Sequence, residues 1–115
     1  MVRHHRVIER WLSGAADPGE FAVFADAHDP GFELCAPDGR VLGAQDVLAE
    51  VRAAHGRAPG LTIDVRDVRV VAEAAGLQVV TYEEWHDGTS GRRATAVLSR
   101  GRWLHLQETR LPGGP

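Results

Sequence analysis

The chain has 115 residues, of which 43% are hydrophobic and 25% are charged, and its formal net charge is −3. These values are typical of one globular domain that buries about two-thirds of the surface its unfolded chain exposes. All 13 basic residues are arginine, which indicates genomic base-composition bias and a bacterial source. The arginines are spread among the carboxylates, whereas a nucleic-acid-binding domain gathers its basic residues on one face, so no nucleic-acid partner is expected.

No apolar run approaches the roughly 20 residues that span a bilayer, and no apolar signal-peptide core follows the first residues. We therefore expect a cytoplasmic protein with no membrane partner. The single Cys35 allows neither an internal disulfide nor a CxxC metal motif. The histidines match neither HxH nor HExxH spacing, so the sequence predicts no metal site, and it indicates no cofactor.

The first half of the chain predicts helices around a short hairpin. Apolar residues at helical spacing predict a helix over residues 2–14, with His4 and His5 exposed at its start. Asp17-Pro18-Gly19-Glu20 is a helix start, because Asp can cap free amides and Pro lacks only a donor that is not needed there; it predicts a helix over 18–28. A hairpin over 32–42 and a helix over 44–55 follow.

The second half predicts an antiparallel meander of four strands. The expected strands are 61–73, 77–86, 92–99 and 102–110, separated by short turns. The element order predicts an α+β fold with the helices on one face of the sheet. We expect a single domain over 1–111 and a flexible tail over 112–115, where Pro and Gly interrupt both helix and strand.

The turns predict the register of the meander and hence its two faces. Centring each turn places Tyr82 opposite Ala96, which in turn lies opposite His105. Small Ala94 and Ala96 then leave space at the middle of one face, where polar side chains converge. The polar and aromatic members of this predicted inner face are Arg66, Tyr82, Glu84, His86, Trp103, His105 and Gln107. The sequence therefore predicts a pocket bordered by the sheet.

The opposite face of the predicted sheet carries an apolar strip. Its members are Trp85, Val97, Leu104 and Leu106, which a monomer would expose to water. We therefore expect a homodimer that forms through this outer face.

Two segments resemble those of SnoaL-like domains in the nuclear transport factor two-like superfamily. One is Ser-Arg-Gly-Arg-Trp-Leu-His-Leu-Gln-Glu-Thr over 99–109, which is similar to a Gly-Arg-Trp turn followed by a last strand ending in His-x-His-x-Ser. The other is Pro-Asp-Gly-Arg-Val-Leu-Gly over 37–43, which precedes a helix. The resemblance implies a cone-shaped, strongly curved and mostly antiparallel sheet packed on three helices, a conical pocket and a homodimer.

The chain departs from the family pattern at two places. Gln107 stands where the second His of the last strand is expected. Where the ketosteroid isomerases of the superfamily have an acid, this chain has Cys35-Ala36-Pro37, and its first helix has no Tyr. Steroid-isomerase chemistry is therefore not indicated.

Glu84 and His105 form the candidate acid–base pair, because a carboxyl group on a partly apolar wall and a nearby imidazole can exchange a proton. The alternative is a structural network in which Glu84 pairs with Arg66 and His105 bonds Gln107. Tyr82 is a third candidate catalytic residue, as a donor to a developing oxyanion, or else a packing residue.

The candidate ligand-binding residues are Trp103, Gln107, Arg66, His28 and Phe24. Trp103 is equally a core filler, and His28 equally a residue at the solvent edge. Two functions stay open. The first is a pocket that binds a small apolar ligand with a carbonyl or hydroxyl group and acts on it as an isomerase, cyclase or dehydratase. The second is a non-catalytic dimerisation or binding module with a filled cone.

Overall fold

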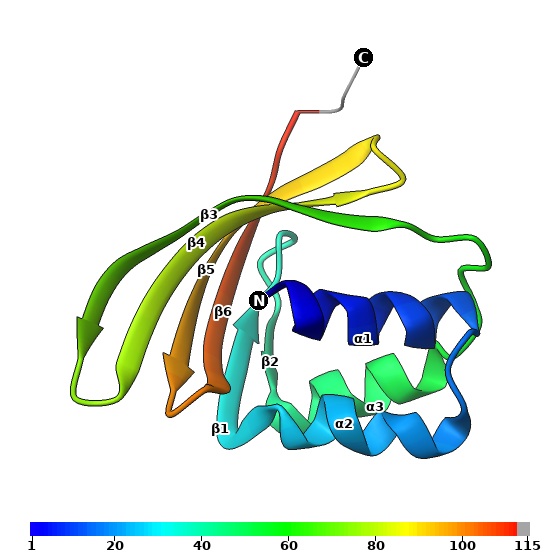
Figure 1. Ribbon diagram of the computed structural model, residues 1–115, viewed down its shortest axis with the longest axis horizontal. Helices are drawn as coiled ribbons and strands as arrows, with labels where there is room; N and C mark the ends of the chain where they lie inside the picture. Colours follow the sequence, from blue (N-terminus) through cyan, green and yellow to red (C-terminus); the bar gives the residue numbers. More distant parts are fainter. Residues whose placement is uncertain (113–115) are drawn as a thin grey trace.

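The computed structural model describes residues 1–112, in which one curved sheet wraps around helices that all lie on its concave side (Figure 1). The elements are α1 (Val2–Ser13), η1 (Pro18–Glu20), α2 (Phe21–Asp26), β1 (His28–Cys35), β2 (Val41–Gly43), α3 (Ala44–Ala53), β3 (Ile63–Ala74), β4 (Leu77–His86), β5 (Ser90–Ser99) and β6 (Arg102–Arg110). Residues 113–115 of the predicted tail 112–115 lie outside the described residues.

The predicted fold class is confirmed: the protein is an α+β cone with a mostly antiparallel sheet. The sheet has six strands in the order β2-β1-β6-β5-β4-β3. The strand order of the meander β3 to β6 follows the sequence prediction, and β1 and β2 form the predicted hairpin. The register differs, because Tyr82 lies opposite Ala94 and not opposite Ala96. β1 also runs parallel to β6, which extends the meander into a single sheet.

The second predicted helix, 18–28, is too long. Its first residues form the short turn η1, where the backbone N–H of Asp17 donates to the Glu20 carboxylate over 2.7 Å. α2 ends at Asp26, and His28 already belongs to β1. Pro30 disfavours helical geometry in the residue before it. The backbone N–H of Trp103 donates to the Ala27 carbonyl at 2.8 Å, beside the point where β1 meets β6.

A β-bulge in β6 decides which side chains face the helices. Leu98 lies opposite Trp103, but Val97 lies opposite His105, so Leu104 is an extra residue without a partner across the ladder. An extra residue exchanges the faces of everything beyond it. His105 and Gln107 therefore lie on the outer face, and their predicted inner placement is wrong. Two other residues take the inner positions: Leu106, which was predicted to lie outside, and Glu108.

A second bulge, in β3, moves Arg66 to the outer face. Asp67 has a φ of 57°, and the register shifts between Arg66 and Arg69. Arg66 lies opposite Glu83, not beside Glu84 as predicted. Its guanidinium donates to Asp64 at 2.7 Å and lies 5.3 Å from the centre of the Trp85 ring.

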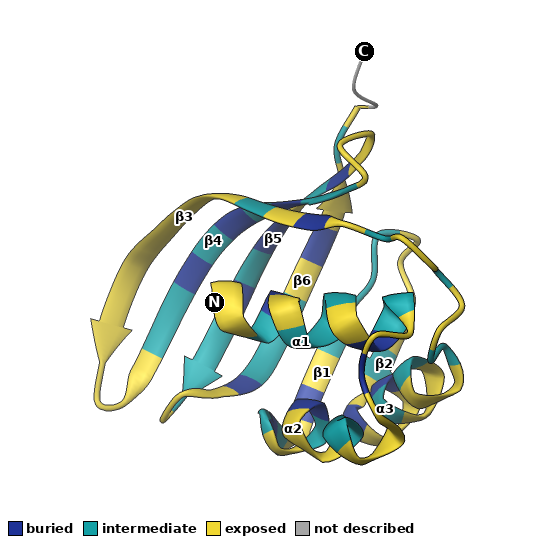
Figure 2. Ribbon diagram, turned by 45° about the vertical axis from the view of Figure 1, so that its right-hand side comes forward, coloured by how far each residue is buried: buried dark blue, intermediate teal, exposed yellow. Residues whose placement is uncertain are grey.

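The core lies between the concave face of β4 to β6 and the helices. Figure 2 shows buried positions in the middle strands, whereas most of β3 is exposed at the edge of the sheet. Tyr82, Ala94 and Ala96 occupy the centre of the face and are almost completely buried. No helix within residues 1–112 is both long and apolar enough to cross a bilayer.

Candidate functional site

A cavity of about 180 Å³ lies in the interior of the cone, and we call it the central cavity. Its apolar lining includes Ile8, Leu12, Phe24, Phe32, Val47 and Trp103, which come from α1, α2, β1, α3 and β6. Its polar lining comes mainly from the inner face of β4 to β6. An apolar cavity with a few convergent polar groups is the usual form of a small-molecule site.

Most of the predicted site residues line this cavity, namely Tyr82, Glu84, Trp103, His28 and Phe24. The other three do not. His105 lies on the outer side, where its Nδ1 is 3.8 Å from a carboxylate oxygen of Glu33. Gln107 is exposed on the same side, and Arg66 pairs with Asp64. The predicted pair of Glu84 with His105, and the alternative pair of Glu84 with Arg66, are therefore both wrong.

Glu84 instead has two histidine partners. Nε2 of His5, on α1, is 2.8 Å from Oε1 of Glu84, and Nε2 of His86 is 2.5 Å from Oε2. His5 is only 1% exposed, contrary to the prediction that it lies on the surface. A signal for this burial exists in the sequence, because His5 precedes Ile8 and Leu12 at helical spacing and shares their stripe.

The hydrogen bonds of His5 show that this pair holds an additional proton. The Met1 carbonyl oxygen can only accept, so Nδ1 of His5, 2.9 Å away, must carry a hydrogen. A second hydrogen must then lie between Nε2 of His5 and the carboxyl group of Glu84. The pair therefore consists either of an imidazolium and a carboxylate or of a neutral imidazole and a carboxylic acid.

The environment of Glu84 decides where that proton resides. Burial alone would raise the pKa of Glu84, but the hydrogen bonds from His5 and His86 outweigh burial and hold this pKa well below its usual range. Glu84 is therefore a carboxylate at neutral pH, and it accepts the hydrogen bond from Nε2 of His5.

A second carboxyl group, Glu108, lies on the same face, and its pKa is shifted in the opposite direction. Its residue is 6% exposed, and Nη1 of Arg92 donates to it at 3.2 Å. Burial raises the pKa of Glu108 above its usual value; Arg92 opposes this shift, and the charge of Glu84 adds to it. Two carboxyl groups whose environments move their pKa values apart are suited to opposite roles, one as proton acceptor and one as proton donor. The sequence analysis missed Glu108 because the β6 bulge was not predicted.

The hydroxyl of Tyr82 is the polar atom of the cavity that has no partner. It is buried, and it forms no hydrogen bond with any residue in the described part of the chain. Burial raises its pKa strongly, and the nearby charges of Glu84 and Glu108 act in the same direction. The hydroxyl therefore keeps its proton and is able to donate it in a hydrogen bond.

Aromatic rings close the other end of the cavity. The His4 ring stacks on Trp103, with the ring centres 4.6 Å apart, and lies nearly parallel to Phe24 at 5.6 Å. Burial and the neighbouring His28 lower the pKa of His4 to about 3. His28 donates from Nδ1 to the Phe24 carbonyl at 2.7 Å, and burial lowers its pKa as well. Both imidazoles are therefore neutral, and this end of the cavity is uncharged.

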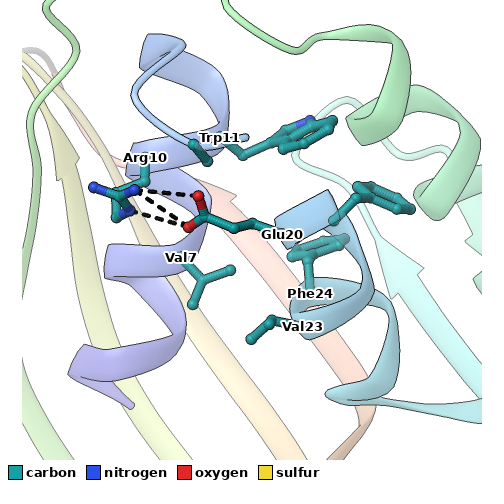
Figure 3. A pocket seen from close by; sticks show the side chains of 8 residues that line it. Val7, Arg10, Trp11, Glu20, Val23 and Phe24 are labelled. Carbon is teal, nitrogen blue, oxygen red and sulfur yellow. Dashed lines mark hydrogen bonds and ion pairs between the residues drawn. The ribbon is translucent and has the colours of Figure 1, made fainter. Parts of the chain in front are cut away.

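A smaller cavity of about 50 Å³ lies between α1 and α2 (Figure 3). Val7, Val23 and Phe24 line it, and its two charged groups, Arg10 and Glu20, bind each other at 3.2 Å. Because those charges are satisfied, we interpret this space as a packing crevice between helices. It has no group left to act on a ligand.

Comparison with known proteins identifies the fold family. No family model matches the sequence, and no curated protein is similar enough in sequence to match. Among solved structures, an NTF-2-like protein of unknown function from Pseudomonas aeruginosa is 27% identical, with a TM-score of 0.91 over 96% of this chain and 94% of that one. This chain has the NTF2-like fold. The predicted resemblance to SnoaL-like domains of that superfamily is thereby confirmed.

Two further structures share the fold of this NTF2-like domain at lower identity. An NTF2-like protein of unknown function in nutrient uptake from Rhodospirillum rubrum is 14% identical, with a TM-score of 0.68 over 96% of this chain and 98% of that one. Aln2 from a Streptomyces species is 23% identical, with a TM-score of 0.65 over 95% of this chain and 86% of that one. At these identities the likeness extends to the fold alone.

Within residues 1–112, the NTF2-like domain has no group of three His, Cys, Asp or Glu side chains placed to hold a metal ion.

We predict that His4 makes the folded state sensitive to acid. Its folded pKa of about 3 lies below the unfolded value of about 6.5, so the unfolded chain binds more protons between these pH values. The free energy of unfolding should therefore fall as the pH drops through this window, by at most about 1.4 kcal/mol per pH unit for this one group. His4→Phe should flatten that fall in urea titrations at pH 7, 6 and 5. His105→Gln, on the outer face, is the control, and identical slopes for His4→Phe and the wild type would contradict the prediction.

Proposed function

We propose that this NTF2-like domain binds a small, largely apolar ligand in the central cavity through a carbonyl or hydroxyl oxygen. The observation that carries the proposal is the unpartnered Tyr82 hydroxyl, which is buried and lines the cavity. A buried hydroxyl without a partner costs about 1–3 kcal/mol, so a side chain kept only for packing is better served by Phe. A ligand oxygen would supply the missing partner.

We further propose that the site moves a proton on that ligand. Glu84, an ionised carboxylate, is the proton acceptor, and His5 takes the supporting role that the sequence analysis gave to His105. Tyr82, and Glu108 when it is in its neutral form, would donate hydrogen bonds to the ligand oxygen as negative charge develops on it. Removal of a proton from the carbon next to a carbonyl, with the oxygen stabilised as an enolate, fits these positions. That step is common to isomerases, cyclases and dehydratases.

The alternative is a non-catalytic binding module. Two observations favour it. The central cavity of about 180 Å³ is smaller than the roughly 300–1,000 Å³ of drug-sized pockets, and Tyr82, Phe24 and Trp103 are each at most 4% exposed. In this case His5 and His86 serve only to neutralise the buried carboxylate of Glu84. The ligand is then either small or absent, and the two experiments below distinguish these functions.

The first experiment removes the Tyr82 hydroxyl. Tyr82→Phe should leave the free energy of unfolding unchanged or raise it by up to about 2 kcal/mol, because no hydrogen bond is lost. The same substitution should weaken binding of acetophenone about tenfold and leave binding of ethylbenzene, which lacks the carbonyl, unchanged. Denaturant titration and NMR chemical-shift titration give these values. A loss of stability together with equal binding of both probes would favour the structural role of Tyr82.

The second experiment follows proton transfer directly. In D₂O, the wild type should speed the exchange of the acetophenone methyl hydrogens for deuterium, and Glu84→Gln should slow this exchange roughly 100-fold or to the buffer rate. Glu83→Gln is the matched control, since Glu83 is the adjacent residue on the outer face, where Arg93 lies 3.3 Å away. A wild type that binds acetophenone but does not speed its exchange leaves the binding module as the function.

We also propose that the chain forms a homodimer through the outer face of the sheet. Trp85, Val97 and Leu104 of the predicted strip stay on that face, and Leu106 no longer belongs to it. Sedimentation velocity should give the mass of two chains for the wild type and of one chain for Val97→Arg. Val41→Arg, an exposed position on β2, is the control that should stay dimeric. A monomeric wild type would contradict the proposal.

A further inference from the structure

A second, charged pocket of about 270 Å³ adjoins the central cavity. Three residues, Leu34, Arg92 and Glu108, line both spaces. The remaining lining of this charged pocket comes from the turn between β1 and β2, from α3 and from the end of β6. Arg92 and Glu108 therefore stand at the boundary between an apolar interior and a polar pocket.

Two arginines occupy opposed positions of the sheet at this boundary. Arg92 of β5 lies directly opposite Arg110 of β6, and both line the charged pocket. Like charges at opposed positions of a β-ladder are unfavourable unless an anion compensates them. The protein neutralises these two positive charges only in part. Glu108 forms an ion pair with Arg92, at 3.2 Å, whereas Arg110 has no ion pair within residues 1–112.

The third arginine of the charged pocket is already satisfied. Arg40 binds Asp38 at 2.9 Å and Glu50 at 3.3 Å. Those two carboxylates are therefore engaged on the far side of the pocket. Arg92 and Arg110 share one carboxyl group of the pocket, Glu108, which is bound to Arg92.

Glu108 is a poor permanent partner for Arg92. It is buried at 6% exposure, and the groups that face it include a second carboxylate, Glu84, as well as Tyr82 of β4 and His5 of α1. Burial and Glu84 both favour its neutral form. When Glu108 is neutral, Arg92 has no ion pair within residues 1–112, and the nearest position with a negative charge on the ladder is Glu84, opposite it on β4.

We propose that Arg92 and Arg110 bind the carboxylate of an amphipathic organic acid whose apolar part lies in the central cavity. The inference rests on the proposed function and specifies its ligand class. Guanidinium groups suit a carboxylate because their planar N–H donors match its two oxygens. A carboxylate bound there also keeps Glu108 protonated by like-charge repulsion, which preserves Glu108 as a hydrogen-bond donor beside Tyr82.

The test compares an acid with its neutral counterpart. By isothermal titration calorimetry at pH 7, the wild type should bind 3-phenylpropanoate about tenfold more tightly than 3-phenylpropanamide. Arg92→Gln should remove this difference and leave the affinity for the amide unchanged. Arg93→Gln is the matched control, because Arg93 is the next residue on β5 and lies on the outer face beside Glu83. NMR spectra of each variant establish that it is folded.

A second variant tests the role of Glu108. Glu108→Gln imitates the protonated side chain and removes a negative charge that competes with the ligand for Arg92. It should therefore bind 3-phenylpropanoate several-fold more tightly than the wild type at pH 8, where ionisation of Glu108 is most advanced. Weaker binding by this variant would contradict the arrangement proposed for Glu108.

The outcomes separate this inference from the proposed function. If the wild type binds acetophenone and the amide but prefers the acid by less than twofold, the inference fails and the proposed function stands. If it binds none of the three probes, both fail. A preference for the acid that survives Arg92→Gln also overturns the inference, because the carboxylate then binds elsewhere.

Discussion

The interior of this protein depends on how one buried carboxylate is neutralised. Glu84 lies at 7% exposure on the concave face of the sheet, where an unpaired charge would cost several kcal/mol. His5 meets it from α1 and His86 from the end of its own strand. The long-range hydrogen bond joins the first turns of α1 to the middle of the sheet. It therefore holds the helix over the cone and sets one wall of the cavity.

Features that depend on local sequence could be predicted, whereas features that depend on distant contacts could not. Turn residues and hydrophobic periodicity act locally, so the helices, the meander and the fold class could be predicted. The turns alone were enough to place Tyr82 and Glu84 on the inner face. The predicted pairing of β4 with β5 was wrong by two residues at the turn Asp87–Thr89, but a shift of two residues leaves every side chain on the same face of the sheet. The β6 bulge at Leu104 shifts the strand pairing by one residue. It therefore places Leu106 and Glu108 on the inner face, where His105 and Gln107 were predicted. Its position depends on the parallel pairing with β1, which no local pattern encodes.

His5 was missed for a different reason. The helical spacing of His5 with Ile8 and Leu12 indicates that it lies on the buried stripe of α1. A histidine near the start of a chain is nevertheless more often solvent-exposed, and His5 was therefore predicted to be exposed. Only the partner makes its burial favourable, and that partner is 79 residues away in the sequence. Pairings between distant polar groups carry little periodic signal. The sequence thus predicted the inner placement of Glu84 correctly, whereas the imidazole beside it belongs to His5 and not to His105.

The two ends of the central cavity also differ in polarity. Neutral His4, Trp103 and Phe24 close one end, whereas Arg92 and Glu108 stand at the other, beside the charged pocket. A ligand with one polar group and one apolar end has a single favourable orientation in such a space, because the reverse orientation would desolvate its polar group among aromatic rings. That orientation brings its oxygen-bearing end toward Tyr82 and Glu84. In the function proposed above, the same asymmetry would place the reacting carbon of the ligand against the Glu84 carboxylate, which is the positioning that proton transfer requires.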